Sequence, residues 1–248
     1  MVDVNEIVTL TRSNIGKEMS GFYDGRLIND ALNYANEALF KVETGIDQLP
    51  EGAPGRYWQK TRKVTDALAP FIVTTGRNGI PYTQVDANGY AAFPSDFYLF
   101  SSMNFPILEL VNGQLVETGT RVITDLTDEI FRSRIASHYK KPNDENIIST
   151  VSNGMMEFAP KNIKRVLFTY LRKPRKPYWD AVFENGRTVY YPPGSVKPNG
   201  QPSLSVDIEW PRMATMQDFY PQYLSFVSTS IKDQATSQAS ERIKITGQ

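Results

Sequence analysis

The sequence has 248 residues, which is enough for one large domain or two small ones. Lys and Arg together number 27, and Asp and Glu also number 27, so the formal net charge is zero and a generally basic nucleic-acid binder is excluded. Because the chain has no cysteine and a single histidine, His138, it cannot form disulfides, thiolate metal sites or multi-histidine metal sites. We expect no cofactor and no bound metal.

We also expect neither a targeting signal nor a membrane span. Residues 1–16 include the acids Asp3 and Glu6 and no apolar run, unlike a signal peptide. The longest apolar stretches fall far short of the ~18 residues that a membrane-spanning helix needs.

Two helices are predicted near the start of the chain. Over residues 26–42, apolar side chains recur every three or four positions, which predicts an amphipathic helix. Its apolar stripe consists of Ile28, Ala31, Leu32, Ala35, Ala38, Leu39 and Val42. Its polar face is filled by Asn29, Asp30, Asn33, Asn36 and Glu37. We expect Gly45 and Pro50 to end this helix, and a second helix over residues 58–68.

The middle of the chain has the turn residues of a β-rich protein. All six Asn-Gly dipeptides lie between residues 78 and 200. Asn-Gly suits a two-residue type I′ turn, because both central residues of that turn need a positive φ. The dipeptides at 112–113 and 153–154 have strand-like flanks, which predicts hairpins over residues 107–117 and 147–158.

Further patterns complete the predicted elements. The apolar run Val166–Leu171 indicates a central strand, and the alternation over Leu204–Trp210 indicates a half-buried strand. A short helix is predicted over Thr127–Ala136. The apolar spacing from Asp218 to Ala239 predicts a long closing helix, provided that Pro221 lies in its first turn.

The order of these elements predicts an α+β fold. We expect N-terminal helices and a long C-terminal helix to pack with a central antiparallel, β-rich, sandwich-like body. The expected parts are a helical region at 1–72, the β-rich body at 73–211, and the C-terminal helix and tail at 212–248.

The sequence contains no recognisable catalytic constellation. It lacks the nucleophile elbow, the phosphate-binding loops and the EF-hand loop. His138 stands beside two lysines, which is typical of a surface position. The acids Asp125, Asp128 and Glu129 fit the first turn of the predicted short helix, where they suit the helix dipole. We therefore expect no enzymatic activity.

The stretch from residue 161 to 176 has seven cations and no acid. The cations are Lys161, Lys164, Arg165, Arg172, Lys173, Arg175 and Lys176. They are candidate contacts either to DNA in a channel or to a neighbouring subunit. The zero net charge favours the interpretation that they are the ends of a strand, either solvated or engaged in intersubunit salt bridges. If all seven engaged duplex DNA, the salt slope of binding would be about −6. Trp179, Tyr190 and Tyr191 are candidate contacts of a partner-binding loop.

The order of several short motifs resembles a group of tailed-phage virion proteins. The motifs are Leu27–Leu32, Asn36–Leu39, Trp58–Thr61, Asp66–Phe71, Phe93–Phe97, Arg132–Pro142, Phe158–Pro160, Phe168–Pro174 and Glu209–Pro211. From about residue 26 to 240, the chain is similar to head-to-tail connectors, the adaptor or tail-tubular ring proteins of short-tailed bacteriophages. It is most like the ring proteins of crAss-like phages of gut Bacteroides-type hosts. Residues 187–202 are longer and richer in proline than this resemblance leads us to expect, which suggests a ring-specific loop.

The resemblance implies a structural virion protein without catalytic residues. Such a protein forms a homo-oligomeric ring of about twelve copies beneath the portal protein, contacts other ring or tail proteins, and lets double-stranded DNA pass without specific binding. It is assembled in the host cytoplasm, ends at the head-to-tail junction of the virion, and contacts no membrane. The alternative is a carbohydrate-binding β-sandwich of a phage fibre or surface protein, suggested by Trp179, Trp210 and the tyrosine pair as exposed aromatics. A glycan hydrolase ranks third.

Overall fold

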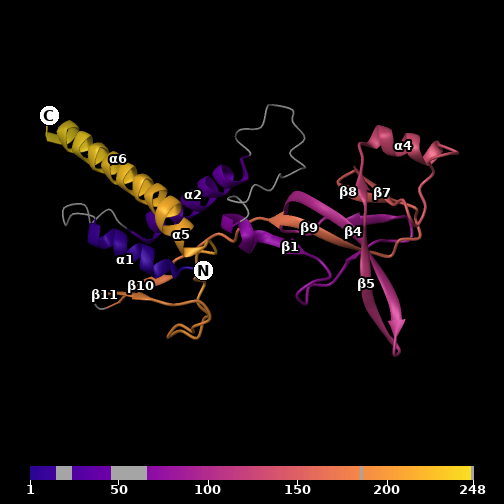
Figure 1. The fold of residues 1–248 in the computed structure, drawn as a ribbon. Helices are drawn as coiled ribbons and strands as arrows, with labels where there is room; N and C mark the ends of the chain where they lie inside the picture. Colours follow the sequence, from indigo (N-terminus) through magenta and orange to yellow (C-terminus); the bar gives the residue numbers. More distant parts are fainter. Residues whose placement is uncertain (15–23, 46–65, 185–186, 247–248) are drawn as a thin grey trace. The chain divides into compact units, whose positions relative to one another are not determined.

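The computed structural model describes residues 1–14, 24–45, 66–184 and 187–246 (Figure 1). The fold is α+β, as predicted. The chain forms two compact units. The helical unit comprises residues 1–51, 61–70 and 174–248, and the β unit comprises residues 52–60 and 71–173. Residues 174–211, which we expected in the β-rich body, therefore belong to the helical unit.

The predicted helix over residues 26–42 is α2 (Gly25–Thr44). It begins at Asp24, whose carboxylate accepts a hydrogen bond from the Leu27 N–H at 2.8 Å. It ends at Gly45, which adopts the left-handed conformation that glycine allows at helix ends (φ 67°). Most of the second predicted helix lies outside the described residues; Asp66–Leu68 are helical and lead into the 3₁₀ turn η3 (Ala69–Phe71).

The closing helix is α6 (Tyr220–Thr246), and it packs against α2 in the helical unit (Figure 1). The short helix α5 (Arg212–Ala214) and the π-helical turn η4 (Thr215–Phe219) precede it. These three elements follow one another without a break, so Pro221 lies inside a continuous helical run and not in the first turn of the closing helix, where we expected it. It closely follows the π-helical turn, an irregularity of the kind found where the regular hydrogen-bond ladder of a helix is interrupted. The N-terminal helix α1 (Val4–Asn14) completes the helices of this unit in the described residues.

Residues 174–184 and 187–211 contact these helices and are largely neither helical nor part of a sheet. Strands β10 (Ala181–Glu184) and β11 (Arg187–Tyr190) pair with each other. The predicted strand over Leu204–Trp210 is wrong, since Val206 and Ile208 form isolated bridges to Tyr178 and Val2 instead of joining a sheet. Side chains of the helices replace the missing strand partners.

Two asparagines of α2 hold this segment. Asn29 and Asn36 are seven residues apart, which places them on the same helix face two turns apart. Asn29 accepts a hydrogen bond from the Trp179 backbone N–H (2.7 Å) and donates one to the Trp179 carbonyl (3.2 Å). Asn36 accepts a hydrogen bond from the Trp210 indole N–H (2.9 Å) and donates one to the Arg175 carbonyl (3.2 Å). Both amides thus act as strand partners.

The placement of Asn36 corrects the sequence prediction. We expected Asn36 on the polar face of α2, but it is buried, and the indole that it binds is fully buried beside Phe40. Ser205 and Glu209 were likewise expected on a polar face and are buried. Each of the three has a polar partner inside the unit, which offsets the cost of burial.

The β unit has two sheets. In the first, strands β1 (Ile72–Thr74), β9 (Arg165–Arg172), β4 (Phe97–Val111) and β5 (Gln114–Val122) lie in that order, and β2 (Thr83–Gln84) also pairs with β9. All pairs are antiparallel. The predicted central strand is confirmed as β9. The predicted turn at Asn112-Gly113 joins β4 to β5 with φ values of 53° and 80°.

The second sheet has the order β3 (Tyr90–Ala92), β8 (Met155–Ala159), β7 (Ile148–Ser152) and β6 (Thr124–Asp125). Its β6–β7 pair is parallel and the other pairs are antiparallel. Met156 and Phe158 contribute to a core shared with β4 and β9, whereas Ala159 packs against Phe131 of α4 (Asp128–Ala136). This alternation along β8 explains the sandwich-like arrangement of the two sheets, with α4 on the outer face.

We predict that Asn36→Ala destabilises the helical unit by about 2–4 kcal/mol, because the Trp210 N–H and the Arg175 carbonyl both lose a partner. Denaturant unfolding followed by tryptophan fluorescence measures the change. Asn33→Ala is the matched control on the same helix. The Asn33 Oδ1 has no hydrogen-bond partner among the described residues, and its Nδ2 donates only to the carbonyl of Asn29 one turn earlier, so removing this side chain should cost less than about 1 kcal/mol. Equal effects of the two substitutions would contradict the role given to Asn36.

Candidate interaction surfaces

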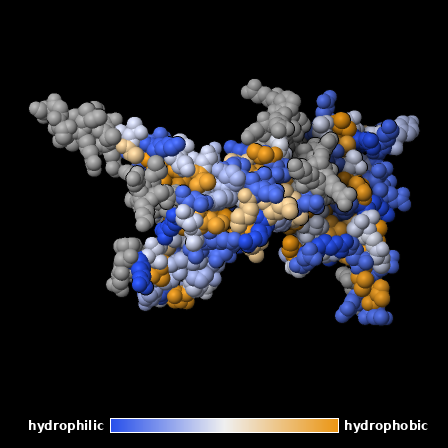
Figure 2. Space-filling view, turned by 60° about the vertical axis from the view of Figure 1, so that its left-hand side comes forward, coloured by the Kyte–Doolittle hydropathy of each residue, from blue (hydrophilic) through white to orange (hydrophobic). Residues whose placement is uncertain are grey.

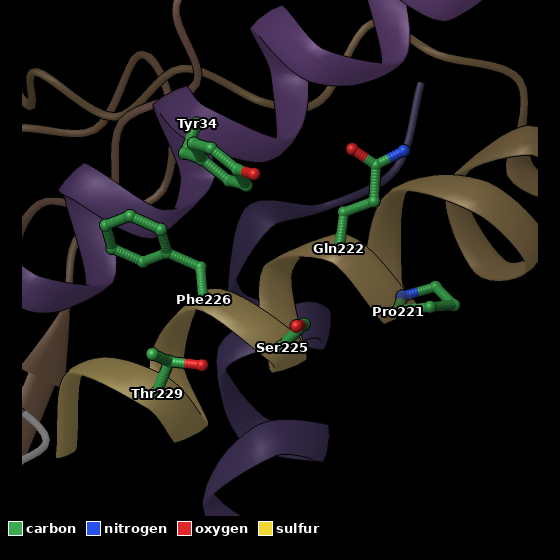
Figure 3. A pocket seen from close by; sticks show the side chains of 6 residues that line it. All are labelled: Tyr34, Pro221, Gln222, Ser225, Phe226 and Thr229. Atoms are coloured by element: carbon green, nitrogen blue, oxygen red, sulfur yellow. The ribbon is translucent and has the colours of Figure 1, made fainter. Parts of the chain in front are cut away.

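A groove in the helical unit exposes an aromatic pair (Figure 3). Tyr34 of α2 stacks on Phe226 of α6 with ring centroids 4.8 Å apart, and the Tyr34 side chain is half exposed. The rest of the groove is one face of α6, formed by Pro221, Gln222, Ser225 and Thr229. The groove has a volume of about 430 Å³. Aromatic residues such as these are enriched in protein–protein contacts relative to the rest of a protein surface.

The aromatic candidates Trp179 and Tyr191 are buried, so the expectation that they form an exposed partner-binding loop is wrong. Trp179 lies between the half-buried Tyr190 ring, which is parallel to it at 6.4 Å, and the guanidinium of Arg12 at 5.0 Å. Its indole N–H donates to Asn5 of α1 at 3.1 Å. These residues therefore tie the segment after β9 to the helices, and Trp210 is buried too.

The loop after β11 is attached through Asp180. The Asp180 carboxylate binds the Lys197 ammonium at 2.7 Å and accepts the Leu204 N–H at 2.8 Å. Burial alone would raise the pKa of Asp180, but these two partners outweigh it and hold that pKa below its ordinary value. The proline-rich segment 187–202 is consequently fastened to the helical unit by a buried charge pair.

The structure separates the seven cations of residues 161–176 into three groups. Lys161, Lys164 and Arg165 lie at the start of β9, and Arg172 and Lys173 lie at its end, about 23 Å away for a strand of this length. Alternation along the strand places Arg165 and Arg172 on opposite faces. The remaining two, Arg175 and Lys176, belong to the helical unit. The sequence cluster is therefore not a single patch on β9.

Most of these cations already have partners inside their own unit. Arg175 binds the buried Glu209 carboxylate at 2.7 Å. The guanidinium of Arg165 lies 5.8 Å from the Tyr82 ring centroid, and that of Arg172 lies 5.4 Å from the Phe71 ring centroid. Lys161, Lys164 and Lys176 are exposed and form no ion pair with a described residue.

The hairpin predicted over residues 107–117 is confirmed, but the sequence did not predict that residues 105–121 project from the sheet as a two-stranded ribbon. β4 pairs with β9 only as far as Asn104; beyond that residue it pairs with β5 alone among the described strands. The ribbon extends away from the sheet (Figure 1). An extended strand of the length of Phe105–Val111 spans about 20 Å. Near its tip, Leu110, Val111 and Val116 have exposed fractions of 72%, 45% and 43%.

At the base of the ribbon, a side chain of β5 is held by two partners, and a hollow lies beside it. Glu117 of β5 binds both Arg77 and the Tyr82 hydroxyl, and the guanidinium of Arg77 holds the pKa of Glu117 below its ordinary value. A hollow of about 320 Å³ lies beside the base. Its lining consists of Phe105, Pro106, Ile107, Leu108, Asn162, Lys164 and Arg165. Two members of the first group of cations, Lys164 and Arg165, thus adjoin an apolar surface.

The catalytic and metal-site candidates remain separate in the described residues. His138 is exposed in the loop after α4. Asp128 and Glu129 occupy the first turn of α4, as predicted, whereas Asp125 belongs to β6. Among the residues that the structure describes, no group of three or more His, Cys, Asp or Glu side chains could hold a metal ion. No helix in that part of the chain is long and apolar enough to cross a membrane.

Comparison with protein-family models and with curated proteins gives no match to this sequence.

We predict that duplex DNA binding by the chain has a salt slope of about −3, since one end of β9 presents three cations. Titrations at several salt concentrations, followed by fluorescence anisotropy of labelled DNA, measure the slope. Changing Lys161 and Lys164 to Gln should reduce its magnitude by about 2, because two phosphate contacts are lost. The matched control changes Arg172 and Lys173 to Gln and should leave it unchanged. A slope near −6 would contradict the separation of the cations.

Proposed function

We propose that the chain is a structural virion protein that forms a ring at the head-to-tail junction of a short-tailed bacteriophage. The ring joins the portal protein to the tail and surrounds the DNA exit channel. The sequence resemblance suggests this role, and the shape and surface of the β unit support it.

The projecting ribbon is the observation that carries the proposal. A two-stranded ribbon is marginally stable in water, and its open edges and exposed apolar tip are a liability for a protein that remains a monomer. Hydrophobic surface is visible on the projection that points downward on the right of Figure 2. In a ring, the ribbon of one subunit is covered by the next subunit, and both problems are removed.

Ring geometry also fits the way the β unit is built. A closed ring requires two different patches on each subunit that bind each other after rotation. Within the β unit, the ribbon tip and α4 lie at opposite ends (Figure 1), so this unit has distinct surfaces for two neighbours. A stable contact of this kind buries about 1,600 Å².

The charge distribution suits a channel through which DNA slides. Tight binding would hold the duplex, and a zero net charge with cations already engaged by rings and carboxylates keeps the attraction weak. Burial of Trp179, Trp210 and Tyr191 weakens the carbohydrate-binding alternative, which was suggested by these residues and the half-buried Tyr190 as exposed aromatics.

Cryo-electron microscopy of the intact particle tests the proposal. We expect density for this chain as a symmetric ring on the portal axis. Finding the polypeptide only outside particles, or at a position off that axis, would refute the proposal. Finding a monomer in solution would not refute the proposal, because ring subunits can remain monomeric until they assemble on the portal.

A variant in the ribbon tests the observation that carries the proposal. Leu110→Asp combined with Val116→Asp should reduce incorporation into particles at least tenfold, because charges then occupy both faces of the ribbon tip. Thermal unfolding should change little, since both side chains are exposed in the free chain. Val42→Asp, at a 63% exposed position of α2, is the control for an added surface charge. Normal incorporation of the ribbon variant would show that the tip is not an interface.

A further inference from the structure

The β unit contains an aromatic cavity between its two sheets. β4 forms one wall, and strands β6, β7 and β8 form the other. The residues that line it are Phe93, Phe97, Tyr98, Phe100, Met103, Asp125, Val151 and Met156. Its volume is about 170 Å³, and a cavity of about 150 Å³ accepts a six-carbon ring. A ligand of five to seven non-hydrogen atoms therefore fits.

The aromatic walls are held in fixed positions. Phe93 stacks on Phe97 with centroids 4.5 Å apart. Phe97 and Phe100 both stack on Phe168 of the core, at 5.7 Å and 5.8 Å. Because these rings are packed from behind, their faces stay in place and do not collapse into the cavity. A preformed cavity loses little freedom when it binds a ligand.

One carboxylate gives the cavity its polarity. Asp125 is the only charged side chain among the described residues that line it. It pairs with Ser149 in the parallel register of β6 and β7, and its Oδ1 accepts the Ser149 hydroxyl at 3.1 Å. The carboxylate is thus oriented by the sheet and not by the ligand.

Aromatic faces and a carboxylate both attract a cation. The ring quadrupole places negative charge on the faces of Phe and Tyr, and ammonium groups bind there when they lie within about 6 Å of the centroid. Tyr98 already shows this behaviour, because the Lys173 ammonium lies 5.8 Å from its ring centroid. An anion would be repelled by Asp125. A neutral hydrocarbon would gain nothing from the charge of Asp125.

We propose that the aromatic cavity binds a small aliphatic ammonium ion. The alkyl chain lies against Phe93, Phe97 and Met156, and the ammonium group donates to the Asp125 carboxylate. Every group in this inference belongs to the β unit, and the inference does not depend on ring formation.

The test uses the full chain labelled at its methionine methyl groups with ¹³C and titrated with n-butylammonium chloride. Two of the seven methionines, Met103 and Met156, line the cavity, while Met213 of the helical unit is exposed and serves as an internal control. We expect saturable shifts of the two cavity signals with a Kd on the order of 1 mM, and no shift of the Met213 signal. Sodium chloride at the same ionic strength should have no effect.

Two comparisons decide whether charge recognition is involved. 1-Butanol has the same chain with a neutral head group and should bind at least tenfold more weakly. Asp125→Asn keeps the shape of the side chain and should weaken butylammonium binding by at least the same factor. If this variant does not fold, the comparison of n-butylammonium with 1-butanol on the unmodified chain shows whether the cavity recognises the charge. Equal binding of both ligands, equal binding by the folded variant, or an absence of saturable shifts would overturn the proposal.

Discussion

Hydrogen bonds from two side-chain amides hold the helical unit together. Backbone outside regular secondary structure still needs partners for its N–H and C=O groups, and residues 174–184 and 187–211 obtain few of them from a sheet. Asn29 and Asn36 supply them from one face of α2, and Asn36 also satisfies the Trp210 indole. The burial of two tryptophans, the position of the Arg175–Glu209 pair and the contact between α2 and this segment all depend on these amides.

The β unit follows a different principle, in which two sheets share one apolar core. β4 is longer than the partner that covers it, so its second half leaves the core and pairs with β5 alone. The chain thereby exposes apolar residues that an isolated domain has no reason to keep outside. In a monomer this extra length leaves the edges and apolar side chains of the ribbon exposed. In an assembly it allows the ribbon to contact a neighbouring subunit.

Charge shows how sequence proximity and spatial proximity differ. Seven cations without an acid between them look like one binding surface in the sequence. A strand in their midst separates them by about 23 Å and turns two arginines to opposite faces. Rings and carboxylates from distant parts of each unit then engage several of them. The aromatic cavity shows the opposite relation. Phe97 and Asp125 are well separated in the sequence and belong to different sheets, yet both line the cavity.

Local patterns by themselves determined the helix α2, the existence of the closing helix, the central strand β9 and both Asn-Gly hairpins, because helix periodicity, caps and turns depend on neighbouring residues. Tertiary structure alone decided which polar residues are buried. Asn36 carries the same local signal as the exposed side chains of its helix, and only a partner 174 residues away makes its burial favourable. The ribbon and the cavity arise from pairings between distant strands, whose registers no local pattern encodes.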